Sequence, residues 1–130
     1  LRQDLAITGS MNQFGVSQPV GGVNEKIEGF FDTCCIKGLT GTQGVIIPRV
    51  NAHNLMLDAR VLEACRKKRF AIYVVEKVEE ALALLTGMVV GQRNAKGRFP
   101  ASSLLGMVEA RVKSLQKKVA HSSACPQDAQ

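Results

Sequence analysis

Aromatic residues are scarce in this 130-residue chain, which has no tryptophan, one tyrosine and five phenylalanines. Proteins that bind single-stranded nucleic acid stack the bases on aromatic side chains. The main basic clusters, at 66–69 and 117–118, contain no aromatic residue. The net charge of +6 therefore predicts solvated helix ends, and nucleic acid is not the expected partner.

Long apolar runs are also missing. Runs such as Ala81–Leu85 are far short of the roughly 20 residues needed to cross a bilayer. Asp4 and Thr8 interrupt any apolar core of a signal peptide. We therefore expect a cytoplasmic protein with no membrane partner.

Metal-ligand spacing is absent around the four cysteines, which are Cys34, Cys35, Cys65 and Cys125. No CxxC occurs, and His53 and His121 fall at no zinc-ligand spacing. The cysteines are expected to be buried small apolar side chains in a reducing compartment, with no metal and no disulfide.

Apolar periodicity alternates along the chain between that of strands and that of helices. Strands are expected near 5–11, returning toward residue 19 after a turn at 12–15, and at 45–47 and 70–75. Helices are expected from Asn24 as the cap to Gly38 as the stop, at 52–68 with a break near Asp58, at 78–86, and from about Ser102 after a loop at 88–100. The pattern predicts mixed α/β layers of the α+β class, with one domain at 1–120 and a flexible tail at 121–130.

The most informative stretch reads Pro-Val-Gly-Gly-Val-Asn-Glu-Lys, from Pro19 to Lys26. Its double glycine, Gly21-Gly22, permits backbone conformations and close approaches that other residues resist. Lys26 then falls in the first turn of a helix, where the helix dipole is unfavourable for a cation. Proteins use such a conflict to make a lysine release its proton, although spacing alone favours a lysine that is merely solvated.

This stretch resembles the segment around the catalytic lysine of Lon-type ATP-dependent serine proteases, Pro-x-Gly-Gly-x-x-Glu-Lys. Further segments resemble the family in the same order, and they are Ala6–Gly9, Gly44–Pro48 followed by Asn51, and Glu79–Leu85. Segments 38–44 and 97–100 look closer to the B-type or Lon-like branches. The resemblance implies the C-terminal part of a Lon proteolytic domain, whose fold resembles a ribosomal-protein domain.

A serine–lysine dyad is the chemistry that the resemblance implies. Lys26 would be the general base, Thr8 would orient its amine, and Gly21 and Gly22 would shape the turn. The family places the nucleophilic serine upstream of Leu5, so we expect it outside this chain and expect the chain alone to be inactive. Ser10 and Ser17 are assigned structural or surface roles, and the spacing around His53 supports no Ser-His-Asp triad.

The resemblance also implies an ATPase module of the same polypeptide that uses ATP and Mg²⁺, unfolded protein substrates, and a hexameric ring. No Walker motif occurs here, so no cofactor is expected on this chain. Two positions depart from classical Lon, since Ser10 replaces an acidic residue and Asn24 replaces a lysine. The alternatives are a non-catalytic family member and a basic RNA-binding module.

A lysine that acts as a base must be uncharged near neutral pH. Its ordinary pKa of about 10.4 must then fall to roughly 7–8, and burial is the one effect large enough. We therefore expect the Lys26 amine to be buried beside the Thr8 hydroxyl, with no carboxylate at salt-bridge distance.

Overall fold

The computed structural model describes the backbone of residues 1–122 and the side chains of residues 1–119. The chain divides into two compact units, Leu1–Gly87 and a second unit that begins at Met88. The first unit holds the sheet and every candidate site residue.

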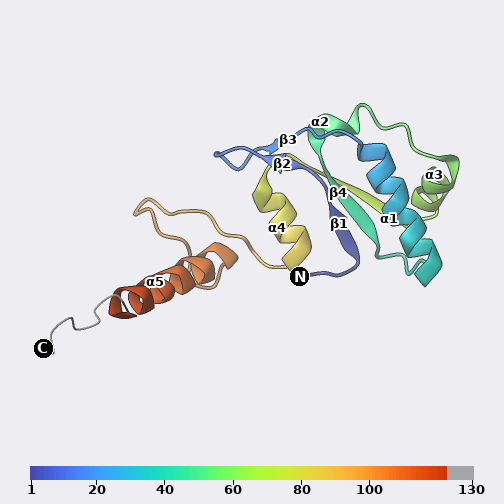
Figure 1. Cartoon of the computed structure of the whole chain (residues 1–130). Helices are drawn as coiled ribbons and strands as arrows, with labels where there is room; N and C mark the ends of the chain where they lie inside the picture. Colours follow the sequence, from blue (N-terminus) through green and yellow to red (C-terminus); the bar gives the residue numbers. More distant parts are fainter. Residues whose placement is uncertain (123–130) are drawn as a thin grey trace, which may run out of the picture. The chain divides into compact units, whose positions relative to one another are not determined.

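Three parallel strands form the sheet of the first unit (Figure 1). In sheet order they are β1 (Leu5–Ile7), β4 (Gly44–Pro48) and β5 (Ala71–Val75). A two-stranded antiparallel hairpin, β2 (Ser10–Met11) and β3 (Ser17–Gln18), follows β1. The helices are α1 (Val23–Lys37), α2 (Arg49–Ala52), α3 (Ala59–Arg66) and α4 (Val78–Thr86). This alternation confirms the α+β class.

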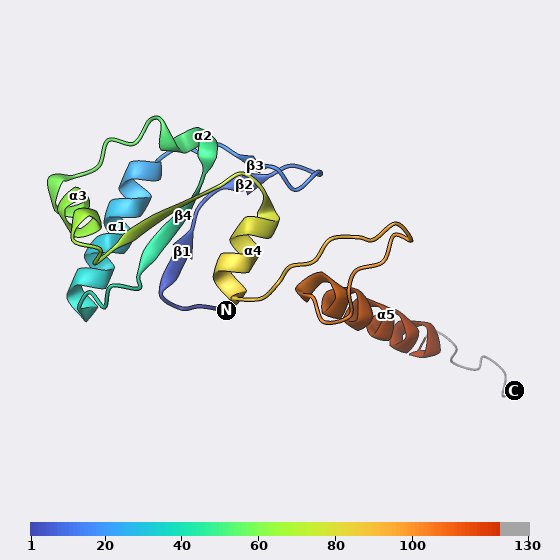
Figure 2. The ribbon, with the colours of Figure 1, turned by 180° about the vertical axis from the view of Figure 1, so that it is seen from behind.

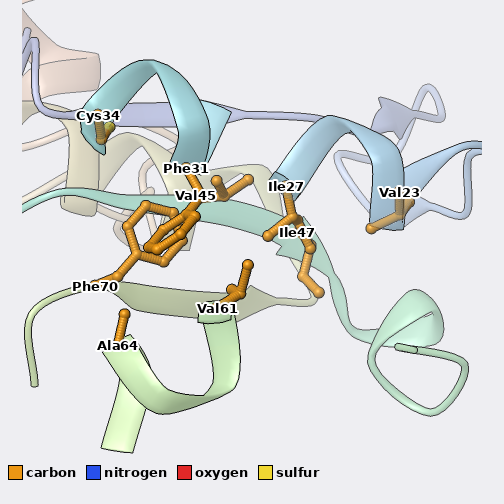
Figure 3. Packing of buried hydrophobic residues seen from close by; sticks show 9 residues of the cluster. All are labelled: Val23, Ile27, Phe31, Cys34, Val45, Ile47, Val61, Ala64 and Phe70. Atoms are coloured by element: carbon orange, nitrogen blue, oxygen red, sulfur yellow. The ribbon is translucent and has the colours of Figure 1, made fainter. Parts of the chain in front are cut away.

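The central strand β4 is buried on both faces, as parallel strands usually are. Val45 and Ile47 pack against α1 and α3 in one core, shown in Figure 3. Ile46, between them, points to a second core with Leu5 and Ala81. Figure 2 shows α4 on the face of the sheet opposite to α1 and α3. The alternation of side chains along one strand thus builds both layers.

The helix α1 buries Val23, Ile27, Phe31 and Cys34, which recur at helical spacing. It stops at Gly38, as expected. Its N-cap is Gly22, so the prediction of Asn24 as the cap is wrong. The Asn24 side chain instead accepts a hydrogen bond from the Met56 backbone N–H at 3.0 Å, a contact between segments far apart in sequence.

The region 52–68 is less helical than expected. The short helix α2 ends at Ala52, and residues 53–58 form a connection before α3 begins at Ala59. Asp58 is the N-cap of α3, because its carboxylate accepts from the Arg60 N–H at 2.7 Å. The helix break near Asp58 is therefore confirmed, but it extends over the preceding five residues.

The strand β5 lies where it was expected but is only half-buried. It is an edge strand of the sheet, and Val74 is 43% exposed. The helix α4 that follows ends at Gly87 in the left-handed conformation, as expected. At its start, the Glu80 carboxylate accepts from the backbone N–H groups of Glu76 and Lys77, and these bonds lower the pKa of Glu80.

The second unit contains a loop and the helix α5 (Leu104–Ser122). Glu109 and Lys113, four residues apart on this helix, form an ion pair at 3.7 Å. Val108, Val112 and Leu115, which recur at helical spacing, are 46–48% exposed. The helix continues through Ser122, beyond the expected start of the tail at residue 121, and residues 123–130 lie outside the described residues.

The described cysteines are free and differ in environment. Cys34 is buried, Cys65 is half-buried and Cys35 is exposed, so the expectation of burial is wrong for Cys35. Cys125 lies outside the described residues. Within residues 1–122, no three His, Cys, Asp or Glu side chains gather as they would around a metal ion. The helices of this part of the chain include none that is long and apolar enough to span a membrane.

Truncation of Ile47 to alanine should destabilise the first unit by about 2–5 kcal/mol, because its side chain is 0% exposed in the core. The matched control is Ile36→Ala, since Ile36 is 88% exposed on α1. That change should alter the free energy of unfolding by less than about 0.5 kcal/mol. Urea unfolding followed by circular dichroism measures both, and equal effects would contradict this account of the core.

Candidate active site

The turn that leads into α1 is shaped by one of its two glycines. Gly22 has φ of +66°, a left-handed conformation that favours glycine, and its carbonyl accepts the Lys26 backbone N–H at 3.1 Å. Gly21 has no such requirement, and a Cβ built there meets no atom within 4 Å. Of the two glycines predicted to support the site, only Gly22 is required by its conformation.

Lys26 lies on the first turn of α1, and its side chain is exposed. The expectation of a buried amine is therefore wrong for this chain. The amine folds back along the start of the helix and donates a hydrogen bond to the Gly21 carbonyl oxygen at 3.1 Å. It forms no ion pair with any carboxylate of the described residues.

The amide and acidic side chains on one face of α1 bond to residues that follow α2 in the chain. The Glu28 carboxylate accepts from the Asp58 backbone N–H at 2.8 Å, and Asp32 pairs with Arg60 at 3.1 Å. Together with Asn24 they form a row, spaced four residues apart, that holds the segment after α2. These bonds explain why neither carboxylate of the row approaches Lys26.

Thr8 is half-buried at the end of β1, and its backbone N–H donates to the Ile46 carbonyl at 3.0 Å. Its side chain lines a groove of about 190 Å³ with mostly apolar walls. The apolar lining residues are Ile7, Met11, Pro48, Val75, Val78 and Ala81. Lys26 does not line this groove, and no hydrogen bond joins it to Thr8. The orienting role of Thr8 stays a prediction.

The two serines nearest to the candidate residues, Ser10 and Ser17, line the same groove. The Ser17 hydroxyl donates to the Val75 carbonyl at 2.9 Å and its N–H donates to the Glu76 carbonyl at 2.8 Å. Ser17 thus fastens the hairpin to the end of β5, which is the structural role expected for it. No hydrogen bond joins either serine to a lysine among the described residues.

Asn51 is the residue of this region whose role the sequence did not predict. Its side-chain Oδ1 accepts from the Val20 N–H at 3.1 Å, and its Nδ2 donates to the Val20 carbonyl at 3.0 Å. The half-buried side chain therefore ties α2 to the segment just before the two glycines. In the sequence, Asn51 was part of the resemblance as the residue that follows Gly44–Pro48, but nothing there indicated its bonds to Val20.

No family model matches this chain. The chain is 51% identical over 89 residues to a protein of Escherichia coli K12 named as a Lon protease homolog, a match that covers 68% of this chain and 15% of that protein. It is 44% identical over 112 residues to a protein of the same name from Haemophilus influenzae, covering 86% of this chain and 19% of that protein. An archaeal Lon protease from Pyrococcus abyssi is 34% identical over 82 residues, covering 63% of this chain and 7% of that protein. The chain thus spans less than a fifth of the length of these relatives.

Alanine at position 22 should destabilise the chain by about 1–2 kcal/mol, since a residue with a Cβ resists the left-handed conformation seen there. Gly21→Ala is the matched control, because the adjacent position has room and an ordinary φ. It should have no effect or be slightly stabilising. Urea unfolding of both variants measures the difference, and a larger loss at Gly21 would contradict the assignment of the constrained glycine.

Proposed function

This chain is a homologue of the Lon-type proteases, and we propose that it is the lysine-bearing part of a serine endopeptidase that, when intact, hydrolyses peptide bonds in unfolded proteins. The observation that carries the proposal is the Pro19–Lys26 segment, which matches the family's lysine motif. Two structural features support it. The segment opens a helix, and the Lys26 amine has no acidic partner among the described residues.

In the proposed reaction Lys26 is the general base for a serine supplied by another segment of the intact protein. The neutral amine takes the proton of the serine hydroxyl while the serine oxygen attacks the scissile carbonyl carbon. The C–N bond of the peptide then breaks, the departing nitrogen receives that proton, and an acyl-enzyme remains. Water hydrolyses the ester with Lys26 again as the base. Thr8 is proposed to orient the amine.

The exposed position of Lys26 is relevant to this chemistry, because a lysine base works in surroundings from which water is excluded. We propose that the serine-bearing segment covers the amine in the intact protein and removes it from water. The hydrogen bond to the Gly21 carbonyl supports this proposal, since it uses one N–H of the amine and holds it at the surface, where another segment can reach it.

Assembly and energy supply follow from the family rather than from these residues. We propose that the intact protein carries an ATPase module that binds ATP and Mg²⁺, forms a hexameric ring, and works in the cytoplasm. The ring would enclose the active sites, and the ATPase module would deliver unfolded chains to them.

The chain alone should have no peptidase activity, because a general base without its nucleophile cannot form the acyl-enzyme. The measurement is release of fluorescence from a labelled casein or peptide by the purified 130-residue chain. Hydrolysis that Lys26→Ala abolishes would contradict this expectation and would assign the nucleophile to Ser10 or Ser17.

In the intact protein, Lys26→Ala should lower kcat by about a thousandfold or more while leaving the fold unchanged, since it removes the proposed base. Lys37→Ala is the matched control, because it removes an exposed lysine from the last turn of the same helix. That control should keep kcat within about twofold. Full activity of Lys26→Ala, in protein shown to be folded by circular dichroism, would exclude the proposed dyad.

A further inference from the structure

Asn51 binds Val20 in the way that a neighbouring β-strand would. The Val20 N–H and C=O both bond to one side-chain amide, at 3.1 and 3.0 Å. A primary amide carries an acceptor and a donor side by side, whereas a carboxylate offers only acceptors. Asparagine can therefore satisfy both groups of Val20 with a single short side chain.

The segment that Asn51 holds has little rigidity of its own. Val20 is followed by Gly21 and Gly22, and glycine loses more conformational freedom on folding than any other residue. A Cβ at Gly21 would meet nothing within 4 Å, so no neighbouring atom packs against that side of the residue. A restraint from outside the segment is needed to fix it, and Asn51 supplies one from a position 31 residues away.

The two hydrogen bonds between Asn51 and Val20 form a clamp, and Asn51 is itself well anchored in the fold. Asn51 lies in α2, which begins directly after Pro48, the last residue of β4. Pro48 is among the fully buried side chains of the chain, and it pairs with Val75 in the sheet. The Asn51 amide is thus tied to the central strand, while the segment that it holds leads directly to α1.

The clamp acts on the residue next to the one that binds Lys26. Val20 directly precedes Gly21, whose carbonyl oxygen accepts a hydrogen bond from the Lys26 amine at 3.1 Å. We propose that Asn51 is a positioning residue for Lys26, fixing the Val20–Gly22 backbone and through the Gly21 carbonyl the place of the amine. This inference rests on the proposed function of Lys26 as a base. A reacting group displaced by about 1 Å can lose about a hundredfold in rate, so loss of the clamp should affect the reaction step.

The first measurement uses the 130-residue chain and asks whether the clamp exists in solution. Hydrogen exchange of the Val20 amide, followed by nuclear magnetic resonance, should quicken at least tenfold in Asn51→Ala. The matched control is Asn54→Ala, because Asn54 is exposed in the adjacent turn and its side chain makes no hydrogen bond among the described residues. Unchanged protection of Val20 in Asn51→Ala would overturn the proposal.

The second measurement uses the intact protein with Asn51→Ala, Asn51→Asp, Asn54→Ala and Lys26→Ala. We expect both Asn51 variants to lower kcat by about tenfold or more with KM within about twofold, normalised to the folded fraction from circular dichroism. A loss of folded protein alone would not separate kcat from KM in this way after normalisation. Asn51→Asp keeps the side-chain volume and decides the result if the alanine variant does not fold.

The outcomes separate this inference from the function on which it rests. If Lys26→Ala is inactive while both Asn51 variants match Asn54→Ala in kcat, the positioning role is wrong and the proposed base stands. If Lys26→Ala is fully active, the proposed base is wrong whatever the Asn51 variants do. Loss of kcat in the Asn51 variants together with an inactive Lys26→Ala supports the positioning role.

Discussion

Burial of β4 on both of its faces is the constraint on which the rest of the first unit depends. Val45 and Ile47 fix α1 and α3 on one side of the sheet, and Ile46 fixes α4 on the other. β4 pairs with β1 along one edge and with β5 along the other, so it joins the three strands into one sheet. Its carboxyl end also carries α2 and Asn51, so the strand that organises the core also supports the candidate site.

The elements that the sequence predicted well are those with a strong local signal. The stripe of Ile27, Phe31 and Cys34 has helical spacing, and Gly38 and Gly87 end helices through the conformational freedom of glycine. The apolar run before Pro48 indicated a buried strand, and β4 is fully buried. In each case the residues that determine the element are neighbours in sequence, so the local pattern is enough to predict it.

The predictions that failed depend on partners distant in sequence. Asn24 has the side chain of a good cap, but the Met56 N–H competes for it, and Gly22 takes the cap position instead. No local sequence pattern shows the role of Asn51, because its partner Val20 lies 31 residues earlier in the chain, before α1 and β4. The burial of Lys26 was argued from the needs of the reaction, whereas the side chain in this chain is exposed and bonded to its own helix start.

The difference at Lys26 has a physical consequence for how such a site works. A lysine amine held by a single carbonyl oxygen keeps the rest of its hydrogen-bonding capacity for water or another segment. If Lys26 is the base, as proposed, its desolvation must come from residues that approach from outside, while its direction comes from the backbone that Asn51 holds. The restraint on the base would then be built into the folded chain, and only its removal from water would depend on a serine-bearing segment. The two requirements of a lysine base, fixed direction and a dry surrounding, would thereby be met by different parts of the protein.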